Sequence, residues 1–238
     1  MRKLEAVICC ALLIVFGGLC IYGKKTGEAI MTAATVKASP ERPTLVIDAG
    51  HGGADGGCVS VNGAVEKDIN LNILLTLRDT MTVMGYDVTC TREADKSIHD
   101  KGVEGLKKQK ISDMKNRLAI FGKYKDGISV SIHQNQFTDP QYSGAQMFYS
   151  EKNADGEVLA KIMQKQFKAL LQPDNEREAK AVGDDLYLLD NTTNPAIMIE
   201  CGFLSNPDEA AKLESAPYQK QVAFTIMTGI KEYELSKK

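Results

Sequence analysis

The sequence predicts an α/β fold: a single three-layer domain in which a twisted, mostly parallel sheet of about six strands lies between helices on both faces. Three observations lead to this prediction. Short apolar runs alternate along the chain with segments that carry apolar residues at helical spacing, as in βαβ units. Glycines and polar residues mark the changes between the two patterns. The 238 residues suffice for one domain of this class with a substantial core.

Strands are predicted where short runs are apolar throughout or alternate between apolar and polar residues. The first run is apolar until it reaches Asp48, as in a strand that is buried on both faces. The second run alternates between the two residue types instead. The predicted strands cover, in chain order, residues 44–48, 86–92, 128–132, 145–149, 185–189 and 196–199.

Helices are predicted where apolar residues recur every three or four positions. The first spans 66–84, and Gly85 ends it because glycine readily adopts the left-handed conformation found after a helix. A second helix is predicted to begin with Ser112 as its N-cap. A third covers about 159–170, and Pro217 begins the last one.

The N-terminal segment has the composition of a membrane-targeting sequence. Residues 1–25 are predicted to be a membrane anchor or a signal peptide, because a basic start precedes an apolar run at 6–22. This run is longer than a usual signal h-region and near the lower limit for spanning a bilayer, so we favour an uncleaved anchor. Residues 26–43 are small and polar, which is typical of a linker, and 44–235 form the folded domain. Either reading places that domain outside the cytoplasm.

Composition argues against nucleic acid as a partner. The net charge is −2, tryptophan is absent and aromatic residues make up only 6% of the chain. Of the six cysteines, only Cys58, Cys90 and Cys201 lie outside the N-terminal segment. Because this set is odd in number and widely spaced, it indicates neither a disulfide framework nor a cysteine zinc site. We expect at least one of the three to be a buried thiol.

A lysine-rich segment, 96–115, interrupts the alternation of strands and helices with six lysines and three acidic residues. It is predicted to be a solvated loop, with contact to a partner as the alternative. His99 lies in this segment and is predicted to be an ordinary surface residue.

Four side chains are expected to meet at one edge of the sheet. His51 follows the first strand, while His133 and Glu200 follow two later ones, and Glu66 opens the first helix. The carboxyl ends of parallel strands share one edge, where α/β proteins bind their ligands. Two histidines and a carboxylate form a common catalytic zinc shell, and a second carboxylate can serve as the general base of a hydrolase.

Other kinds of site are not supported. The helix-borne motif H-E-x-x-H and the nucleophile elbow G-x-S-x-G are both absent. The glycine cluster at 50–57 lacks the G-K-[ST] of a phosphate-binding loop. Cys201 is adjacent to Glu200, but strand alternation turns its thiol to the opposite face.

Several motifs together resemble one known family. DAGHGGADGG, GAVEKD, SVSIHQN and PAIMIECGFLSNPDEA follow one another in the order found in the zinc-dependent N-acetylmuramoyl-L-alanine amidases, the Amidase_3 family. The resemblance extends from Leu45 to about Tyr233. It implies a zinc amidase catalytic domain at 44–235 that hydrolyses the amide between N-acetylmuramic acid and the L-alanine of the peptidoglycan stem peptide.

The resemblance also implies roles for individual residues. The zinc ligands of the family fall on His51, Glu66 and His133, with one zinc ion per chain, and its catalytic glutamate falls on Glu200. Recurrent arginines fall on Arg92 and Arg117, for which we expect structural roles. Large division-associated members carry a blocking helix after the second histidine. Here only a short stretch, about 136–143, precedes the next strand, which implies an open site.

Within the family, the size of the chain, its single N-terminal segment, the lysine-rich insert and the NERE sequence near Arg177 are most similar to the spore-cortex amidases of sporulation and germination. This similarity implies a location at the outer face of the cytoplasmic membrane, in the cell wall, or between the forespore and mother-cell membranes. The implied partners are peptidoglycan and, through the N-terminal segment, the membrane. A regulatory protein and the oligomeric state are left open.

Two other functions remain as alternatives at this point. One is a non-catalytic protein that binds or assembles peptidoglycan on the same scaffold. The other is a zinc peptidase that cuts within the stem peptide.

Overall fold

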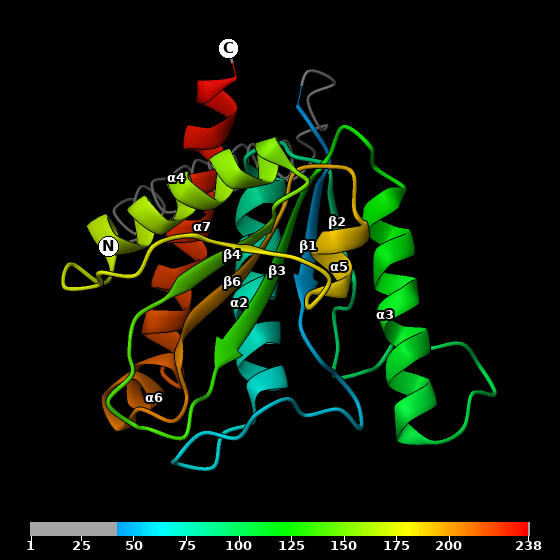
Figure 1. Ribbon diagram of the computed structural model, residues 1–238, viewed down its shortest axis with the longest axis horizontal. Coiled ribbons are helices and arrows are strands. Elements are labelled where there is room, and N and C mark those ends of the chain that lie inside the picture. The colour runs from blue at the N-terminus through cyan, green and yellow to red at the C-terminus, as the bar shows by residue number, and fades with distance from the viewer. Residues whose placement is uncertain (1–41, 238) are drawn as a thin grey trace, which may run out of the picture.

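The structure, a computed structural model, describes residues 42–237 and has a six-stranded sheet at its centre (Figure 1). The strand order is β2-β1-β3-β6-β4-β5, and only β4 and β6 run antiparallel to each other. The predicted α/β fold with a mostly parallel sheet is therefore confirmed. The strands are β1 (Leu45–Ala49), β2 (Val88–Cys90), β3 (Ile128–Asn135), β4 (Gln146–Ser150), β5 (Lys180–Val182) and β6 (Ala196–Phe203).

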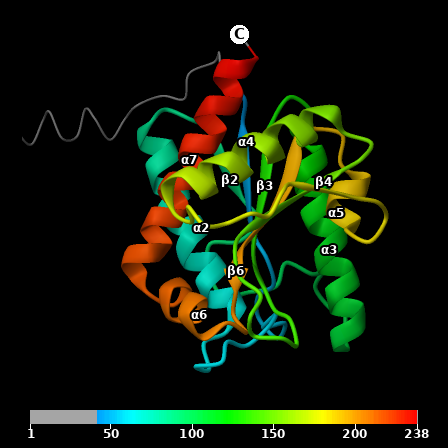
Figure 2. The same ribbon diagram turned by 60° about the vertical axis from the view of Figure 1, so that its left-hand side comes forward.

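Helices cover the two faces of the sheet unequally, as Figure 2 shows. Three long helices pack on one face, with α7 in contact with both α2 and α4. On the other face lie α3, over β1, and the single short helix α5, near β4 and β6. The helices are α2 (Glu66–Val83), α3 (Leu106–Gly122), α4 (Ala154–Leu170), α5 (Tyr187–Asn191), α6 (Pro207–Leu213) and α7 (Ala216–Ser236).

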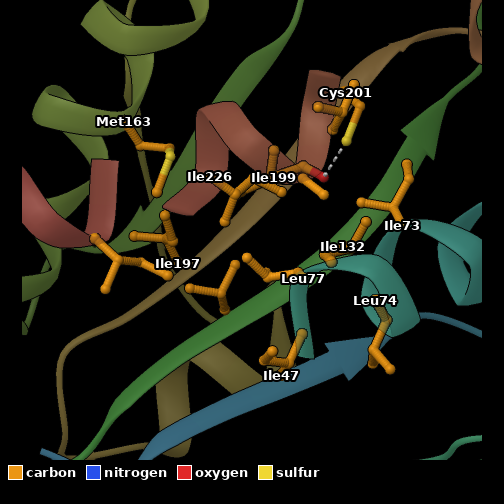
Figure 3. Packing of buried hydrophobic residues seen from close by; sticks show 14 of the residues in the cluster. Ile47, Ile73, Leu74, Leu77, Ile132, Met163, Ile197, Ile199, Cys201 and Ile226 are labelled. Carbon is orange, nitrogen blue, oxygen red and sulfur yellow. Dashed lines mark hydrogen bonds between the residues drawn. The ribbon is translucent and has the colours of Figure 1, made fainter. Parts of the chain in front are cut away.

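The main core lies between the sheet and the three long helices (Figure 3). Strand residues such as Ile132 and Ile197 are fully buried there against α2, α4 and α7. On the opposite face, a much smaller cluster joins Val46 to Phe121 and Leu188. Because side chains alternate along a strand, His133 points to the lightly covered face while Ile132 enters the core. The polar residues of the strands thus gather where few apolar side chains cover them.

Two strands continue further than their apolar runs predict. The predicted strand 128–132 extends to Asn135, and the predicted strand 196–199 extends to Phe203. His133 and Glu200 therefore lie within β3 and β6, where they are paired in register, rather than after the strands end. Polar side chains do not interrupt these strands, because the backbone pairing continues beneath them.

One predicted strand is wrong. Residues 185–189 belong to the helix α5 and the turn before it, whereas the edge strand β5 lies earlier, at Lys180–Val182. The apolar run YLL fits either element, since short runs carry no clear period. In the structure, the adjacent Leu188 and Leu189 are both buried, as a short helix lying against the sheet allows.

The lysine-rich segment is also corrected. The helix α3 begins at Leu106, after Gly105, so half of the predicted loop 96–115 is helical. Ser112 is therefore inside the helix and accepts a hydrogen bond from the backbone N–H of Asp100 (2.9 Å). Lysine is a good helix former, and the first turns of α3 are exposed, which explains why no apolar stripe marked them.

Some predictions concern residues that lie outside the described chain. The predicted anchor 1–25 and nearly all of the linker 26–43 belong to this part. Within residues 42–237, no helix combines the length and the apolar character that crossing a bilayer requires. Cys58, Cys90 and Cys201 are free thiols, and Cys201 is fully buried, which confirms the expected buried thiol.

Candidate metal and catalytic site

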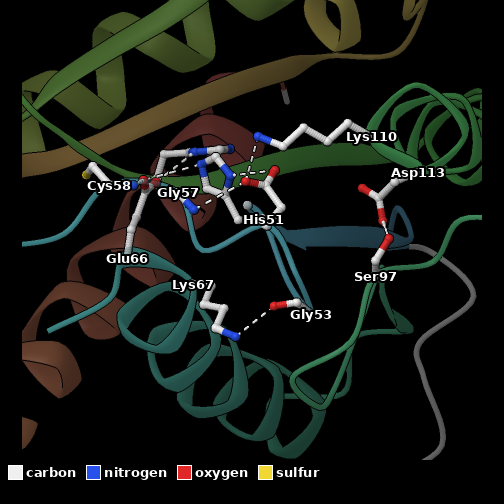
Figure 4. Close-up of polar contacts among 12 residues, drawn as sticks. His51, Gly53, Gly57, Cys58, Glu66, Lys67, Ser97, Lys110 and Asp113 are labelled. Carbon is white, nitrogen blue, oxygen red and sulfur yellow. Dashed lines mark hydrogen bonds and ion pairs between the residues drawn. The ribbon is translucent and has the colours of Figure 1, made fainter. Parts of the chain in front are cut away.

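The structure brings the predicted residues together at one edge of the sheet, where Figure 4 shows His51 and Glu66 next to each other. His51 lies just after β1, His133 lies on β3, and Glu66 is the first residue of α2. One donor atom from each of these three side chains lies within 4.8 Å of the other two. Glu200 is the register partner of His133 on the neighbouring strand. The four side chains therefore form one cluster, although they are far apart in the sequence.

The carboxylate of Glu66 is the centre of this cluster. Its Oε1 lies 3.0 Å from Nδ1 of His133, and its Oε2 lies 3.3 Å from Nε2 of His51. The backbone N–H groups of Cys58 (2.9 Å) and Gln134 (3.1 Å) donate to it as well. Burial alone would raise the pKa of Glu66, but the hydrogen bonds with the two histidines outweigh it and hold the pKa well below its usual value. The group is therefore held as an anion.

The ring of His51 is oriented by a residue that the sequence analysis did not identify. Its Nδ1 lies 3.1 Å from the carboxylate of Asp55, which in turn pairs with Lys110 at 2.7 Å. This contact leaves Nε2 directed at Glu66. His51 also has a positive φ of 63°, a backbone conformation that is uncommon for residues other than glycine. The contact between Asp55 and the ring of His51 depends on how the backbone turns after β1, which the sequence alone did not show.

Two glycines make room for these side chains. A Cβ atom on Gly50 would lie 2.1 Å from Cε1 of His133. A Cβ atom on Gly57, whose φ is 73°, would lie 2.4 Å from Oε2 of Glu66 and 2.6 Å from Cδ2 of His51. The glycine-rich segment therefore leaves space for the site's own histidines and carboxylate, which agrees with the exclusion of a phosphate loop.

Two buried arginines hold the loop that carries His51. Arg92 donates to the carbonyl oxygens of Ala49 (3.0 Å) and Gly50 (3.1 Å). Arg117 donates to those of Ala49 and His51, both at 2.7 Å. The contacts fix the backbone on either side of the positive φ, which agrees with the structural roles expected for the two arginines.

Asp48 is a second buried carboxylate near the site, for which the sequence analysis found no role. It accepts hydrogen bonds from Arg117, Ser131 and, at 2.6 Å, Thr91. Burial would raise its pKa, but the Arg117 charge and the hydroxyl hydrogen bonds hold the pKa below its usual value. In the sequence, the position of this charged residue at the end of an apolar strand was the signal that could have indicated its role.

Glu200 differs from both of these carboxylates. Its Oε2 is buried and has no hydrogen-bond partner among the residues that the structure describes. Burial raises the pKa of Glu200 to about 7, more than the nearby histidines lower it. This carboxylate oxygen without a hydrogen-bond partner lies near two imidazole rings and the anionic Glu66. Such a set of groups is suited to bind a cation and a water molecule. Nitrogen and oxygen donors in this combination are those of catalytic zinc.

The site opens on the lightly covered face of the sheet. A cavity of about 400 Å³ extends from His51 and His133 between α3 and α5. No helix lies between Asn135 and Gln146, in accordance with the open site that was expected. There is therefore room for a substrate to approach the two histidines.

Comparisons with known proteins agree with this arrangement. The family described as N-acetylmuramoyl-L-alanine amidase matches residues 45–232. A germination-specific N-acetylmuramoyl-L-alanine amidase of Bacillus subtilis is 37% identical over 189 residues, which is 79% of this chain and 78% of that protein.

Two solved structures from Clostridioides difficile, also named Clostridium difficile, are similar as well. The CwlD amidase, solved in complex with the GerS lipoprotein, has a TM-score of 0.79 and 38% identity, covering 83% of this chain and 100% of that one. An N-acetylmuramoyl-L-alanine amidase from strain 630 has a TM-score of 0.71 and 30% identity, covering 82% and 98%. This chain therefore belongs to the N-acetylmuramoyl-L-alanine amidase family.

Proposed function

We propose that this amidase works with one zinc ion held by His51, Glu66 and His133, and with Glu200 as its general base. The observation that carries the proposal is the position of an unpartnered, buried carboxylate beside three donor groups within 4.8 Å of one another. A binding protein without catalytic activity has no need for such a carboxylate, because burying it costs free energy.

Each residue has a distinct task in the hydrolysis. A zinc ion held by His51, Glu66 and His133 would lower the pKa of the attacking water and polarise the substrate carbonyl. Glu200 accepts the proton of the attacking water and passes it to the nitrogen of the departing L-alanine. Asp55 supports the first ligand by fixing the ring of His51.

We extend the proposal to the cellular setting. The N-terminal segment 1–25 anchors the enzyme, which acts on spore-cortex or other cell-wall peptidoglycan outside the cytoplasm. The similarity to a germination-specific amidase supports the cortex as substrate. The similarity to an amidase solved with a lipoprotein supports a lipoprotein partner as regulator.

Product analysis tests the reaction. The full-length protein with zinc is incubated with spore-cortex and with vegetative peptidoglycan, and the products are identified by mass spectrometry. We expect peptides with a free L-alanine amino terminus and glycan without peptides. Cuts within the stem would instead support the zinc peptidase, and the absence of soluble products from both substrates would support the binding protein.

Metal analysis tests the ligands separately. We expect His51→Ala and His133→Ala to lose bound zinc, whereas Glu200→Gln should retain zinc but turn over substrate much more slowly. Full zinc content in either histidine variant would overturn the ligand assignment.

A further inference from the structure

Arg177 lies beside β6, the strand that carries Glu200, but it belongs neither to the candidate site nor to the residues that surround Asp48. It is in the segment between α4 and β5, and its Nη1 donates to Oε1 of Gln146 at 2.7 Å. Gln146 is the register partner of Glu200 across the antiparallel pair of β4 and β6. Directly opposed residues share one face of a sheet and have Cα atoms about 5 Å apart. The guanidinium therefore lies one strand away from the proposed general base.

The guanidinium is held in a fixed orientation. Its Nε donates to the carbonyl oxygen of Ser143 at 2.9 Å, and its plane lies over the ring of Phe203, 4.6 Å from the centroid. Gln146 is itself fixed, because its Nε2 donates to the carbonyl oxygen of Glu178 at 3.1 Å. A ligand that binds Arg177 thus meets a side chain whose conformation is already ordered.

The charge of Arg177 is also not neutralised by the protein. Lys67 and Lys110 each have a carboxylate at 2.7 Å, and Arg117 pairs with two buried aspartates. Arg177 has no carboxylate within 4.0 Å among residues 42–237, and its Nη2 has no hydrogen-bond partner in the same range. The nearby Glu209 instead accepts from the backbone N–H groups of Gly144 and Phe203.

We propose that Arg177 binds a carboxylate of the stem peptide, on the acidic residue that follows the L-alanine released by the enzyme. This inference rests on the proposed role of Glu200, which places the scissile amide at β6. One extended residue spans about 3.3–3.6 Å, so the acid group of the next residue reaches the neighbouring strand. A planar guanidinium with free N–H groups is well suited to bind a carboxylate by two hydrogen bonds. Arg177 therefore determines which stem peptides the enzyme prefers.

The test uses two synthetic muramoyl tripeptides that differ only at the α-position of the second residue, which is either a carboxylate or a carboxamide. We expect the wild-type enzyme to hydrolyse the carboxylate form with a kcat/KM about tenfold higher or more. In Arg177→Gln the ratio falls to about one, and in Arg177→Lys part of it remains. A wild-type ratio near one, or an unchanged ratio in Arg177→Gln, would overturn the proposal.

A binding measurement separates this inference from the proposed catalysis. In the Glu200→Gln protein, calorimetry with the two tripeptides is expected to show the same preference, and adding Arg177→Gln should remove it. If the wild type cleaves neither tripeptide but this preference is found, the catalytic proposal fails while the role of Arg177 stands. Lys220→Gln, on the exposed side of α7, is the control for the loss of one positive charge and should keep the wild-type ratio.

Discussion

Two clusters of buried charge lie next to each other at the carboxyl edge of the sheet, and they are satisfied differently. Around Asp48, every contact is internal: Arg117, Thr91 and Ser131 surround the carboxylate. Around Glu200, the nearby groups are histidines and a second carboxylate, and one oxygen has no partner within the described chain.

The difference distinguishes a charge that the fold neutralises from one that is left available for the proposed catalysis. A buried carboxylate that is fully hydrogen-bonded and ion-paired holds the backbone in place, and here it supports the loop that carries His51. A buried carboxylate that lacks a partner is costly unless a ligand completes it. The first cluster should therefore control stability, and the second should control activity.

The largest expected effect is on activity. Replacing the proposed general base in Glu200→Gln should lower kcat by about 10²–10⁴-fold. The same change should leave the free energy of unfolding of the metal-free protein unchanged or higher, because it removes an unpartnered buried carboxylate. Turnover assays and urea titrations check the two parts. Loss of stability together with activity would contradict the proposed separation.

The next effect is on stability. Arg117→Met removes the partner of Asp48 and Asp113 and should lower the free energy of unfolding by about 3–5 kcal/mol. The matched control is Arg78→Met, which removes the partially exposed pairs with Asp79 and Glu93 and should cost less than about 1 kcal/mol. Urea unfolding of both variants measures the difference. Equal losses would show that the Asp48 cluster does not carry the stability assigned to it.

A smaller effect is expected from two glycines with similar backbone conformations. Gly57 and Gly63 both have positive φ, 73° and 96°, so alanine at either position costs about 1–2 kcal/mol of backbone strain. Only at Gly57 would the added Cβ collide with Glu66 and His51, whereas nothing lies within 4 Å at Gly63. We expect Gly57→Ala to weaken zinc binding by about tenfold or more and Gly63→Ala to leave it unchanged. Zinc titration with a competing chelator measures both affinities, and equal affinities would contradict the steric argument.

The last comparison concerns pH dependence, whose slope is limited to about 1.4 kcal/mol per pH unit for one proton. The pKa of Asp48 is held below its ordinary value of 3.8, so its stabilising contribution is complete above that pH and is lost as the pH falls. Burial raises the pKa of Glu200 from 4.5 to about 7, so its contribution is complete below 4.5 and is lost as the pH rises through about 7.

Unfolding of the metal-free protein between pH 3 and pH 8 tests these opposite signs. Relative to the wild type, Glu200→Gln should gain stability from about pH 4.5 to pH 7. Asp48→Asn should lose stability as the pH rises above the folded-state pKa of Asp48. Parallel curves for the two variants would show that the two carboxylates titrate alike.

The sequence allowed prediction of much of the fold where residue patterns are strong. The helix α2 ends before Gly85, whose φ is 85°, as its C-terminal glycine predicted. The predicted start of α3 and the predicted strand at 185–189 were wrong. Exposed lysines and a short apolar run show no clear period. Secondary structure was thus least predictable in segments that bury no continuous apolar face, because their residues show no helical or strand period.

The candidate site was predictable in its members but not in its surroundings. His51, Glu66, His133 and Glu200 occur in recognisable motifs, and the structure places them together. Asp55 was missed because it is one carboxylate in a turn, with no pattern to connect it to the ring of His51. Contacts between side chains depend on the path of the backbone, which local sequence does not specify.

The sequence by itself determined the class of fold, the edge of the sheet where the site lies and the four residues that form it. Periodicity encodes the elements, and parallel strands necessarily bring their ends together. Only the tertiary structure decided which buried charges are neutralised. Asp48 finds its partner 69 residues away in Arg117, and Arg177 finds a neutral amide 31 residues away in Gln146. These distances in sequence are closed only by packing, so the difference between a satisfied charge and an available one is a property of the folded chain.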